Sequence, residues 1–409
     1  MENVTDIMVS GAGLAGLSAA LALAQTGRNV TLAGLLDTRP GTRTVALLDG
    51  SMRFYEALDL RAAIEAQGAP LRVMRIVDDT GSLFRGSPCE FEAGEIGFDA
   101  FGWNIENGLL LDILAKAARA DSRIEIRDSL TRSYEFGAEC VTAALSDGSR
   151  ISSRLLVACD GVRSLARETA GIKGQSWSYP QTALTAIMAH GLSHRDVSTE
   201  FHTREGPCTF VPLPRAPDGS FRSSLVWVMH PREARRRSAL EAQALVEDMA
   251  RASHHILGKL TLERGPAFVP MEGLQVRAFS AQRLALAGDA AHAFPPIGAQ
   301  GLNLGLRDVA HLRDCVSEGH GGDPGSPDVL NAYARRRQGD VASRTFGVDL
   351  MNRSLLTHIL PVDLARGLGL QALRSIGPLR RLAMREGIMP ARNAPSMMRQ
   401  HPASQFIER

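Results

Sequence analysis

The first thirty residues pair two apolar runs with a glycine-rich turn and a helical pattern. The run DIMVS, which begins at Asp6, has the apolar character of a buried strand, and Leu14, Leu17 and Leu21 then recur at helical spacing. Gly27 follows the helical pattern at the usual capping position, and NVTLA supplies a second apolar strand. The pattern predicts a strand, a helix and a second strand, the opening unit of a nucleotide-binding α/β sheet.

The turn after the first strand carries a glycine triplet. Gly11, Gly13 and Gly16 stand in the slots of G-x-G-x-x-G. Glycines at these positions allow the tight turn, let backbone N–H groups approach a pyrophosphate, and bring the helix close to the strand. The positive end of the helix dipole favours the same anion. The alternative is a tight turn with a purely structural role.

The end of the second strand departs from the usual dinucleotide-binding pattern. An Asp or Glu normally holds the adenosine ribose there, but Gly34 occupies the position and the next carboxylate is Asp37. Either Asp37 takes this role or the contact is missing. If the backbone at Gly34 tolerates a side chain, a Gly34→Glu variant is expected to hold the nucleotide more tightly.

The pattern changes between residues 174 and 280 to short stretches of alternating apolar and polar residues separated by Pro, Gly and Asp, which predict an antiparallel sheet. A helical pattern over 238–252 interrupts it, and the run RLALAGD then returns to the parallel type. A chain of 409 residues is also long enough for two domains. We therefore predict an α/β protein with a discontinuous Rossmann-like domain (1–72, 97–173 and 281–350), an inserted antiparallel β-sheet substrate domain (73–96 and 174–280) and a helical C-terminal region (351–409).

Composition and charge narrow the class of protein. The chain is 44% hydrophobic and 22% charged, as ordinary globular proteins are, and its net charge of +2 gives no field that would attract nucleic acid. Five cysteines without any C-x-x-C spacing argue against a zinc site or a disulfide framework and indicate reduced thiols in a cytosol. No apolar stretch is long enough to span a bilayer. A cytoplasmic protein is expected.

Two further turns resemble phosphate-binding or ribitol-binding segments. A hydrophobic strand ends at Asp160-Gly161, and a second strand ends at Gly288-Asp289. Together with the glycine triplet, these D-G-x-x-S-x-x-R and G-D-A-A-H segments resemble, in this order, the FAD-dependent class A aromatic monooxygenases. The segments PPIGAQGLNLGLRD, GTRTVAL, GWNIENGLLLDIL and GPCTFVPLP with a following LVW resemble the UbiH-type ubiquinone-biosynthesis hydroxylases.

The resemblance implies a function and its cofactors. It implies an FAD-binding Rossmann-like domain and a monooxygenase that uses NAD(P)H and O2, by way of a hydroperoxide at flavin C4a, to hydroxylate the aromatic ring of a polyprenylated phenol or quinol. The cofactor then carries the chemistry, and the protein positions the phenol and excludes water. Three alternatives stay open: a hydroxylase of a small soluble phenol, a flavin-dependent reductase, and a non-catalytic component of a biosynthetic complex.

The resemblance also implies where the flavin lies. Asp289 would accept a ribitol hydroxyl, and the helix that begins near Gly301 would direct N–H groups at the pyrimidine edge of the ring, which is anionic when reduced. The expected cofactor-binding residues are Gly11, Gly13, Gly16, Arg43, Asp160, Gly161, Gly288, Asp289, Gly301, Leu302 and Asn303, and the expected catalytic loop contains His292, Pro295, Pro296 and Gly298.

Three of these residues have a simpler interpretation beside the functional one. His292 is either a proton carrier or a histidine that only holds its loop. Asp160 is either a cofactor ligand or part of an ordinary Asp-Gly turn. Arg43 lies along the cofactor pyrophosphate or at the mobile flavin, or it forms a surface ion pair.

Two basic segments suggest partners. HPREARRR (230–237) would contact the phosphate of NADPH or lipid headgroups, or else form a solvated surface. The tail from 355 to 390 mixes leucines with arginines, so it either lies on a membrane surface or caps the flavin domain. Peripheral association with the inner face of the membrane, or with a ubiquinone-biosynthesis complex, is the corresponding expectation.

Overall fold

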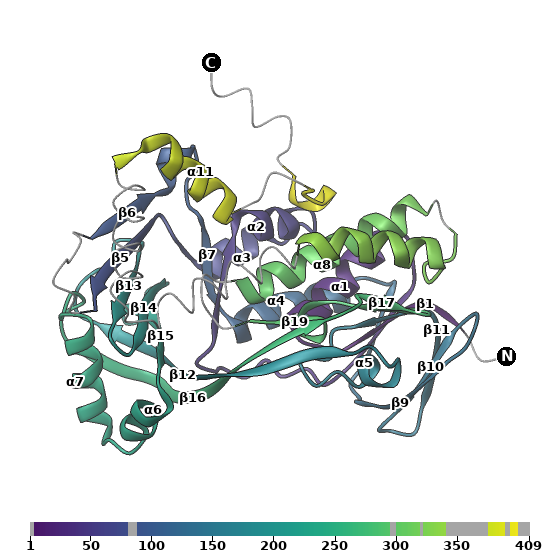
Figure 1. The fold of residues 1–409 in the computed structure, drawn as a ribbon, viewed down its shortest axis with the longest axis horizontal. Helices are drawn as coiled ribbons and strands as arrows, with labels where there is room; N and C mark the ends of the chain where they lie inside the picture. Colours follow the sequence, from purple (N-terminus) through teal and green to yellow (C-terminus); the bar gives the residue numbers. More distant parts are fainter. Residues whose placement is uncertain are drawn as a thin grey trace.

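The computed structural model describes residues 4–80, 88–294, 300–319, 322–340, 375–388 and 393–399. Figure 1 shows two halves joined by two long strands. One half contains a mostly parallel sheet, and the other contains a larger, mostly antiparallel sheet. The predicted α/β class with an antiparallel sheet beside a Rossmann-like sheet is confirmed.

The parallel sheet has the order β17-β18-β11-β1-β2-β8. Its central strand β1 is parallel to both neighbours, β11 and β2, as the opening pattern predicts. The hairpin β9–β10 extends β11 on one side. The strands are β1 (Thr5–Ser10), β2 (Val30–Ala33), β8 (Ile124–Arg127), β9 (Thr131–Phe136), β10 (Val141–Leu145), β11 (Arg150–Ala158), β17 (Ser280–Ala281) and β18 (Leu284–Leu286).

Helix α1 (Leu14–Ala24) fills the centre of this half because its residues are small and apolar on every side. All positions from Gly16 to Ala24 are buried. It packs between α4 (Asn107–Ala120) and α8 (Gln300–Glu318). Smaller elements complete the half: α5 (Leu165–Thr169), the 3-10 helix η2 (Gly288–Ala290), and a helical segment over 327–340 that Ser326 precedes.

The large sheet has the order β19-β16-β12-β15-β14-β13-β5-β6. Its long strands β12 and β16, of 17 residues each, reach across to the parallel half. Only β5 and β13 are parallel neighbours. The strands are β5 (Val73–Asp79), β6 (Cys89–Glu92), β12 (Gly174–His190), β13 (Val197–Thr203), β14 (Gly206–Leu213), β15 (Phe221–Met229), β16 (Leu260–Val276) and β19 (His292–Ala293).

The two faces of the large sheet have different neighbours. One face carries Phe201, Trp227 and other apolar side chains that form a core with α6 (Pro231–Ser238) and α7 (Ala242–Ala252), and we call it the outer face. The opposite face carries Thr185, whose hydroxyl lies 2.8 Å from that of Thr42 in the parallel half. We call this the inner face.

A small third sheet and several helices lie between the halves. It has the order β3-β7-β4, with β3 (Thr44–Leu48), β7 (Gly102–Glu106) and β4 (Ala69–Pro70). Around it are α2 (Asp49–Glu56), α3 (Arg61–Gln67) and η1 (Ala93–Ile96). Along the chain, segments alternate between the parallel sheet and the large sheet. On this basis we propose the discontinuous domain division given above.

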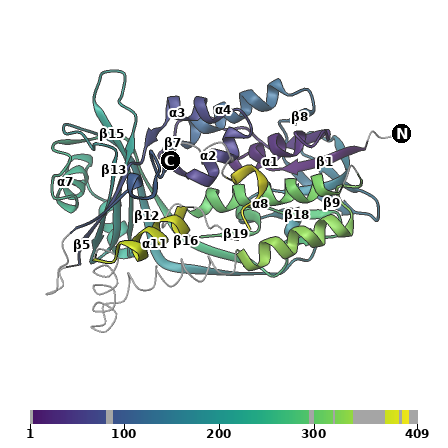
Figure 2. The same cartoon turned by 90° about the horizontal axis from the view of Figure 1, so that it is seen from above.

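The described parts of the C-terminal region pack on both halves. Helix α11 (Gly377–Ile388) lies beside the β5–β6 edge of the large sheet (Figure 2), where Met384 is buried against Ala93 and Ile96. The short helix η3 (Ser396–Met398) places both of its methionines in the core of the parallel half. No helix within the described ranges is long and apolar enough to cross a membrane.

Candidate cofactor site

The glycine turn after β1 fits a closely approaching ligand. Gly11 has φ of +101°, and a Cβ on it would lie 2.4 Å from the carbonyl oxygen of Cys159. A Cβ on Gly16 would lie 1.7 Å from the oxygen of Gly11, so the helix can sit this close only with glycine there. Gly13, at the N-cap of α1, has nothing within 4 Å of a Cβ position. The turn is therefore tight on its protein side and open in front of the helix.

Gly34 is required by the same turn. Its φ is +156°, and a Cβ there would lie 2.5 Å from the backbone nitrogen of Ala12. The backbone at Gly34 thus does not tolerate a side chain. A Gly34→Glu substitution is therefore expected to disturb the turn rather than add a ribose contact. Asp37 is exposed and paired with Arg39 at 2.7 Å, and hydrogen bonds from Arg39 lower the pKa of Asp37 to about 2.

The Asp160-Gly161 turn uses one carboxylate oxygen for structure and leaves the other unpartnered. Oδ2 of Asp160 accepts a hydrogen bond from the backbone N–H of Ala166 at 3.3 Å, while Oδ1 is buried without a partner among the described residues. Desolvation raises the pKa of this carboxyl. Gly161 takes a φ of +84°, which favours glycine. A ligand with a hydroxyl or amide donor would satisfy Oδ1.

Arg167 connects this turn to the next one. Its guanidinium is buried and donates to the carbonyl of Ala290 at 2.9 Å and to that of Val162 at 2.8 Å. Ser164 accepts the backbone N–H of Arg167 at 3.1 Å, which caps α5. The serine and arginine of the D-G-x-x-S-x-x-R segment thus hold two candidate cofactor loops together.

Asp289 presents an exposed carboxylate beside the Gly288 turn. Its side chain is solvent-exposed and has no hydrogen-bond partner among the described residues. Enclosure by the surrounding protein nevertheless raises its pKa, against the opposing charges of His292 and Arg43. Arg43 is itself exposed, and its positive charge favours the ionised form of Asp289. A carboxylate in this setting can accept a ribitol hydroxyl.

A buried network of charged side chains holds the Gly288-Asp289 turn in place. Asp308 on α8 accepts the N–H of Gly288 at 2.9 Å, and its carboxylate lies 2.6 Å from Nε2 of His292. Nε of Arg337 donates to the other oxygen of Asp308 at 2.7 Å. His292, Asp308 and Arg337 are all fully buried. Burial alone would raise the pKa of Asp308, but the charges of His292 and Arg337 lower it.

This network bears on the two interpretations of His292. The ring is enclosed and bound to a carboxylate, and it stacks on Phe294 with centroids 5.4 Å apart. The contacts agree with a histidine that holds its loop, and its role as a proton carrier stays a prediction. Pro295, Pro296 and Gly298 lie outside the described residues.

The start of α8 is fixed to the β3–α2 segment. The amide oxygen of Asn303 accepts the N–H of Leu48 at 2.9 Å and the hydroxyl of Ser51 at 2.6 Å, and its amide nitrogen donates to Ala46 at 2.8 Å. The side chain of Asn303 thus anchors the helix. Gly301 and Leu302 precede Asn303 in the first turn of α8. Because backbone N–H groups in the first turn of a helix have no partner within the helix, we propose those of Gly301 and Leu302 as the contacts to a flavin.

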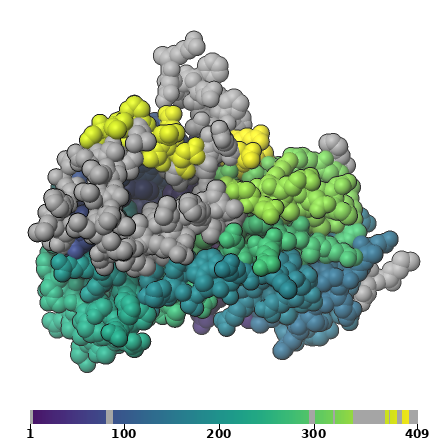
Figure 3. Space-filling model, in the orientation of Figure 1, coloured from purple at the N-terminus to yellow at the C-terminus, as the bar shows by residue number. Residues whose placement is uncertain are grey.

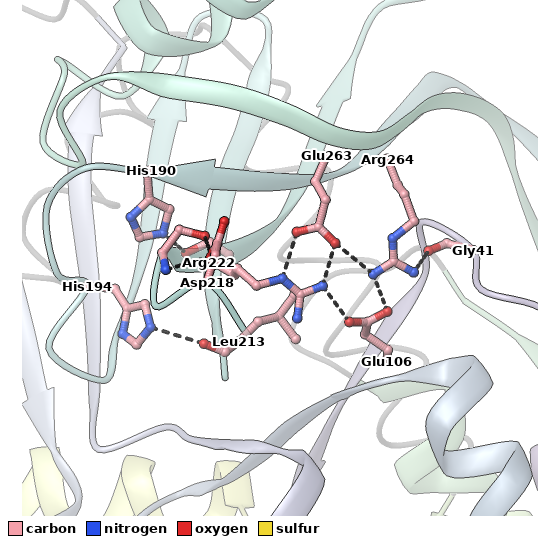
Figure 4. Close-up of polar contacts among 11 residues, drawn as sticks. Gly41, Glu106, His190, His194, Leu213, Asp218, Arg222, Glu263 and Arg264 are labelled. Carbon is pink, nitrogen blue, oxygen red and sulfur yellow. Dashed lines mark hydrogen bonds and ion pairs between the residues drawn. The ribbon is translucent and has the colours of Figure 1, made fainter. Parts of the chain in front are cut away.

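Four charged side chains join the two halves beside this site (Figure 4). Glu106 accepts hydrogen bonds from Arg222 at 2.8 Å and from Arg264 at 2.5 Å. Arg222 also donates to Glu263 at 2.7 Å, which lowers the pKa of that carboxyl. Arg264 reaches the carbonyl of Gly41 at 3.2 Å. The cluster therefore fixes the loop that carries Arg43 against the inner face of the large sheet.

The basic segment 230–237 is partly neutralised by acidic neighbours. Arg236 lies 2.9 Å from Glu233 and 2.7 Å from Asp248. Arg237 is buried, pairs with Asp248 at 3.1 Å and stacks over Trp227 at 4.0 Å. Arg237 therefore packs against the outer-face core, and Arg236 forms exposed ion pairs with Glu233 and Asp248. The NADPH or lipid contact of this segment stays a prediction.

Comparison with known proteins identifies the class of protein that this fold and site define. A family model described as an FAD binding domain matches residues 4–345, and the chain belongs to this family. It is 32% identical over 397 residues to a ubiquinone hydroxylase, UbiL, of Rhodospirillum rubrum, covering 95% of this chain and 90% of that protein. The 3-demethoxyubiquinol 3-hydroxylase of Escherichia coli is 28% identical over 93% of this chain and 97% of its own. The resemblance inferred from the motifs is confirmed, and so is FAD as the cofactor.

Solved structures show the same fold at lower identity. The p-nitrophenol 4-monooxygenase PnpA of Pseudomonas putida superposes with a TM-score of 0.77 at 19% identity, covering 94% of this chain and 97% of its own. PqsL of Pseudomonas aeruginosa, a probable FAD-dependent monooxygenase, gives a TM-score of 0.74 at 22% identity over 90% of this chain and 100% of its own.

Replacement of Asp289 by Ala is expected to weaken FAD binding by about 10- to 100-fold, because it removes a charged acceptor worth about 1.5–3 kcal/mol. The measurement is a fluorescence titration of FAD-free protein with FAD. Asp147→Ala, which removes an exposed carboxylate bound to Ser149 in the turn between β10 and β11, is the matched control and should leave the dissociation constant unchanged. Equal affinities for the wild type and Asp289→Ala would remove Asp289 from the site.

Proposed function

We propose that the protein is an FAD-dependent monooxygenase that hydroxylates the aromatic ring of a prenylated phenol or quinol in ubiquinone biosynthesis, with NAD(P)H as reductant and O2 as oxidant. The observation that carries this proposal is the similarity to a ubiquinone hydroxylase along 95% of the chain. When bound, FAD supplies the redox chemistry. The residues of the chain hold the cofactor, position the ring and exclude water.

The inner face of the large sheet offers a surface for an apolar substrate. Val226 on β15 and Ile76 on β5 stand in one row of register partners that ends at Thr185, so their side chains share the inner face. Val228 and Ala183 form a second apolar group on the same face. Figure 3 shows a hollow beneath α11 whose floor is formed by N-terminal residues. The apolar side chains on this face suit a prenyl chain.

Affinity is expected to rise with the length of the prenyl chain. Each methylene removed from water contributes about 0.8 kcal/mol, so one fully buried isoprene unit strengthens binding by at least about tenfold. The measurement is NAD(P)H oxidation and hydroxylated product for phenols with the same ring and zero to several isoprene units, in detergent. Equal turnover and affinity for the phenol without a tail would favour the alternative, a hydroxylase of small soluble phenols.

Oxygen consumption without a hydroxylated product from any of these phenols would instead favour the flavin-dependent reductase. A purified protein that takes up no FAD would favour the non-catalytic component.

We also propose that the protein works at a membrane surface, where such a substrate is found. The exposed side of α11 carries Leu382, which is 59% exposed, together with the exposed Arg381 and Arg385, and Ile376, which is 49% exposed, directly precedes the helix. Apolar and basic side chains on one surface helix suit an anionic bilayer. Binding to vesicles with 30 mol% anionic lipid should fall by about tenfold in a Leu382→Glu variant, since an anionic side chain replaces an apolar one. Equal sedimentation of both proteins with the vesicles would exclude α11 as the contact.

A further inference from the structure

His202 on β13 is a buried histidine with one unpartnered ring nitrogen. Its side chain is 10% exposed, and Nε2 lies 2.7 Å from Oε1 of Glu200. Nδ1 is enclosed without a hydrogen-bond partner among the described residues. Because a carboxylate can only accept, Nε2 carries a proton, and in the neutral imidazole Nδ1 then presents a lone pair. A buried acceptor without a donor is costly, so a ligand that brings a donor to this position is favoured.

The register of the large sheet places His202 on the inner face. Glu200 is the register partner of Thr209, which in turn pairs with Val226 and, through it, with Thr185. His202 is two residues from Glu200 on the same strand, so both side chains point to the same side. This is the side whose Thr185 contacts the parallel half.

The surroundings fix the ring. The hydroxyl of Thr209 donates to Oε2 of Glu200 at 3.2 Å, which holds the carboxylate in place. The register partners of His202 are Asp78 on β5 and Pro207 on β14. Oδ1 of Asp78 is occupied by the backbone N–H and the hydroxyl of Thr80, at 3.1 and 2.7 Å. The pair is therefore an oriented acceptor on the face that also carries the apolar side chains of Ile76 and Val226.

We propose that His202 is a specificity-determining residue, whose Nδ1 accepts a hydrogen bond from a ring hydroxyl of the phenolic substrate. Glu200 acts through it, as a positioning residue that fixes the tautomer and the ring orientation. The proposal rests on the function proposed above. It adds that the enzyme distinguishes a free hydroxyl from the same ring carrying a methyl ether, because only the hydroxyl can donate.

The test compares two probes with the FAD-loaded enzyme: a phenol with a short prenyl chain, and its O-methyl ether. Their dissociation constants are read from the change in flavin absorbance on binding. The wild type is expected to bind the phenol about 10- to 100-fold more tightly than the ether. A His202→Phe variant, which keeps an aromatic ring but has no acceptor, should bind both within about threefold, and Glu200→Gln should lie between.

His190→Phe is the matched control. His190 is also buried in the large sheet, but it lies on the outer face, and its ring nitrogens are occupied by Leu192 at 2.8 Å and Ser223 at 2.9 Å. Its loss should leave the preference for the phenol unchanged. If His202→Phe does not fold, His202→Leu takes its place with the same expectation.

The proposal is overturned if the wild type binds the phenol and the ether equally, or if both His202 variants keep the preference. A wild type that prefers the phenol through His202 but forms no hydroxylated product would instead contradict the proposed function and leave the assignment of His202 intact.

Discussion

An Arg337→Met variant is expected to lose about 3–5 kcal/mol of folding stability, because it removes a fully buried cationic partner of Asp308 and leaves His292 as the remaining ion-pair partner of that buried carboxylate. Arg337 is fully buried and bonded to Asp308 and Asp340. Asp308 in turn holds the N–H of Gly288, so the same variant should also retain less FAD. The measurement is urea unfolding of the FAD-free protein.

The adjacent arginine provides the control for this variant. Arg336 forms an ion pair with Glu318 in which the two side chains are 33% and 59% exposed. An exposed pair contributes about 0–1 kcal/mol, so Arg336→Met should unfold close to the wild type. If both variants lost the same stability, the buried network would have no special role beneath the Gly288-Asp289 turn.

Replacement of Gly16 by Ala should have a comparable effect on the other side of the site. The added Cβ would overlap the backbone oxygen of Gly11 at 1.7 Å, so α1 must move away from β1. We expect a loss of about 3 kcal/mol or more in stability and no retention of FAD. Thermal unfolding and the flavin absorbance of the purified protein measure the two effects.

Gly13→Ala separates folding from cofactor binding in the same turn. Nothing lies within 4 Å of its Cβ position, so the FAD-free protein should lose no more than about 1 kcal/mol. The new methyl group would nevertheless stand in the open space before the helix, where we place the pyrophosphate, and should weaken FAD binding. Unchanged FAD affinity in this variant would show that the pyrophosphate does not bind at the glycine turn.

Local signals in the sequence predicted much of the fold. The β1–α1–β2 unit follows from leucine spacing and the glycine triplet. The strand near residue 284 was also predicted as parallel, and β18 pairs in parallel with β11. In these cases the residues that determine the structure are neighbours along the chain.

The parts that could not be predicted depend on contacts between distant residues. Asp308 and Arg337 belong to separate helical segments, and nothing in their spacing indicates that they pair. His202 alternates with Phe201 and Thr203 on a short strand, so the face it occupies follows only from the register of four neighbouring strands. The need for glycine at position 34 likewise comes from the approach of Ala12.

The central claim is that the FAD-loaded protein transfers one atom of O2 to the ring of a prenylated phenol. The most direct measurement is the mass of the product formed under ¹⁸O2 with NAD(P)H and a short-chain prenylated phenol. We predict one ¹⁸O atom in the product, with NAD(P)H consumed in proportion. A protein that binds FAD and oxidises NAD(P)H but gives only hydrogen peroxide, with no ¹⁸O in the phenol, would contradict this account.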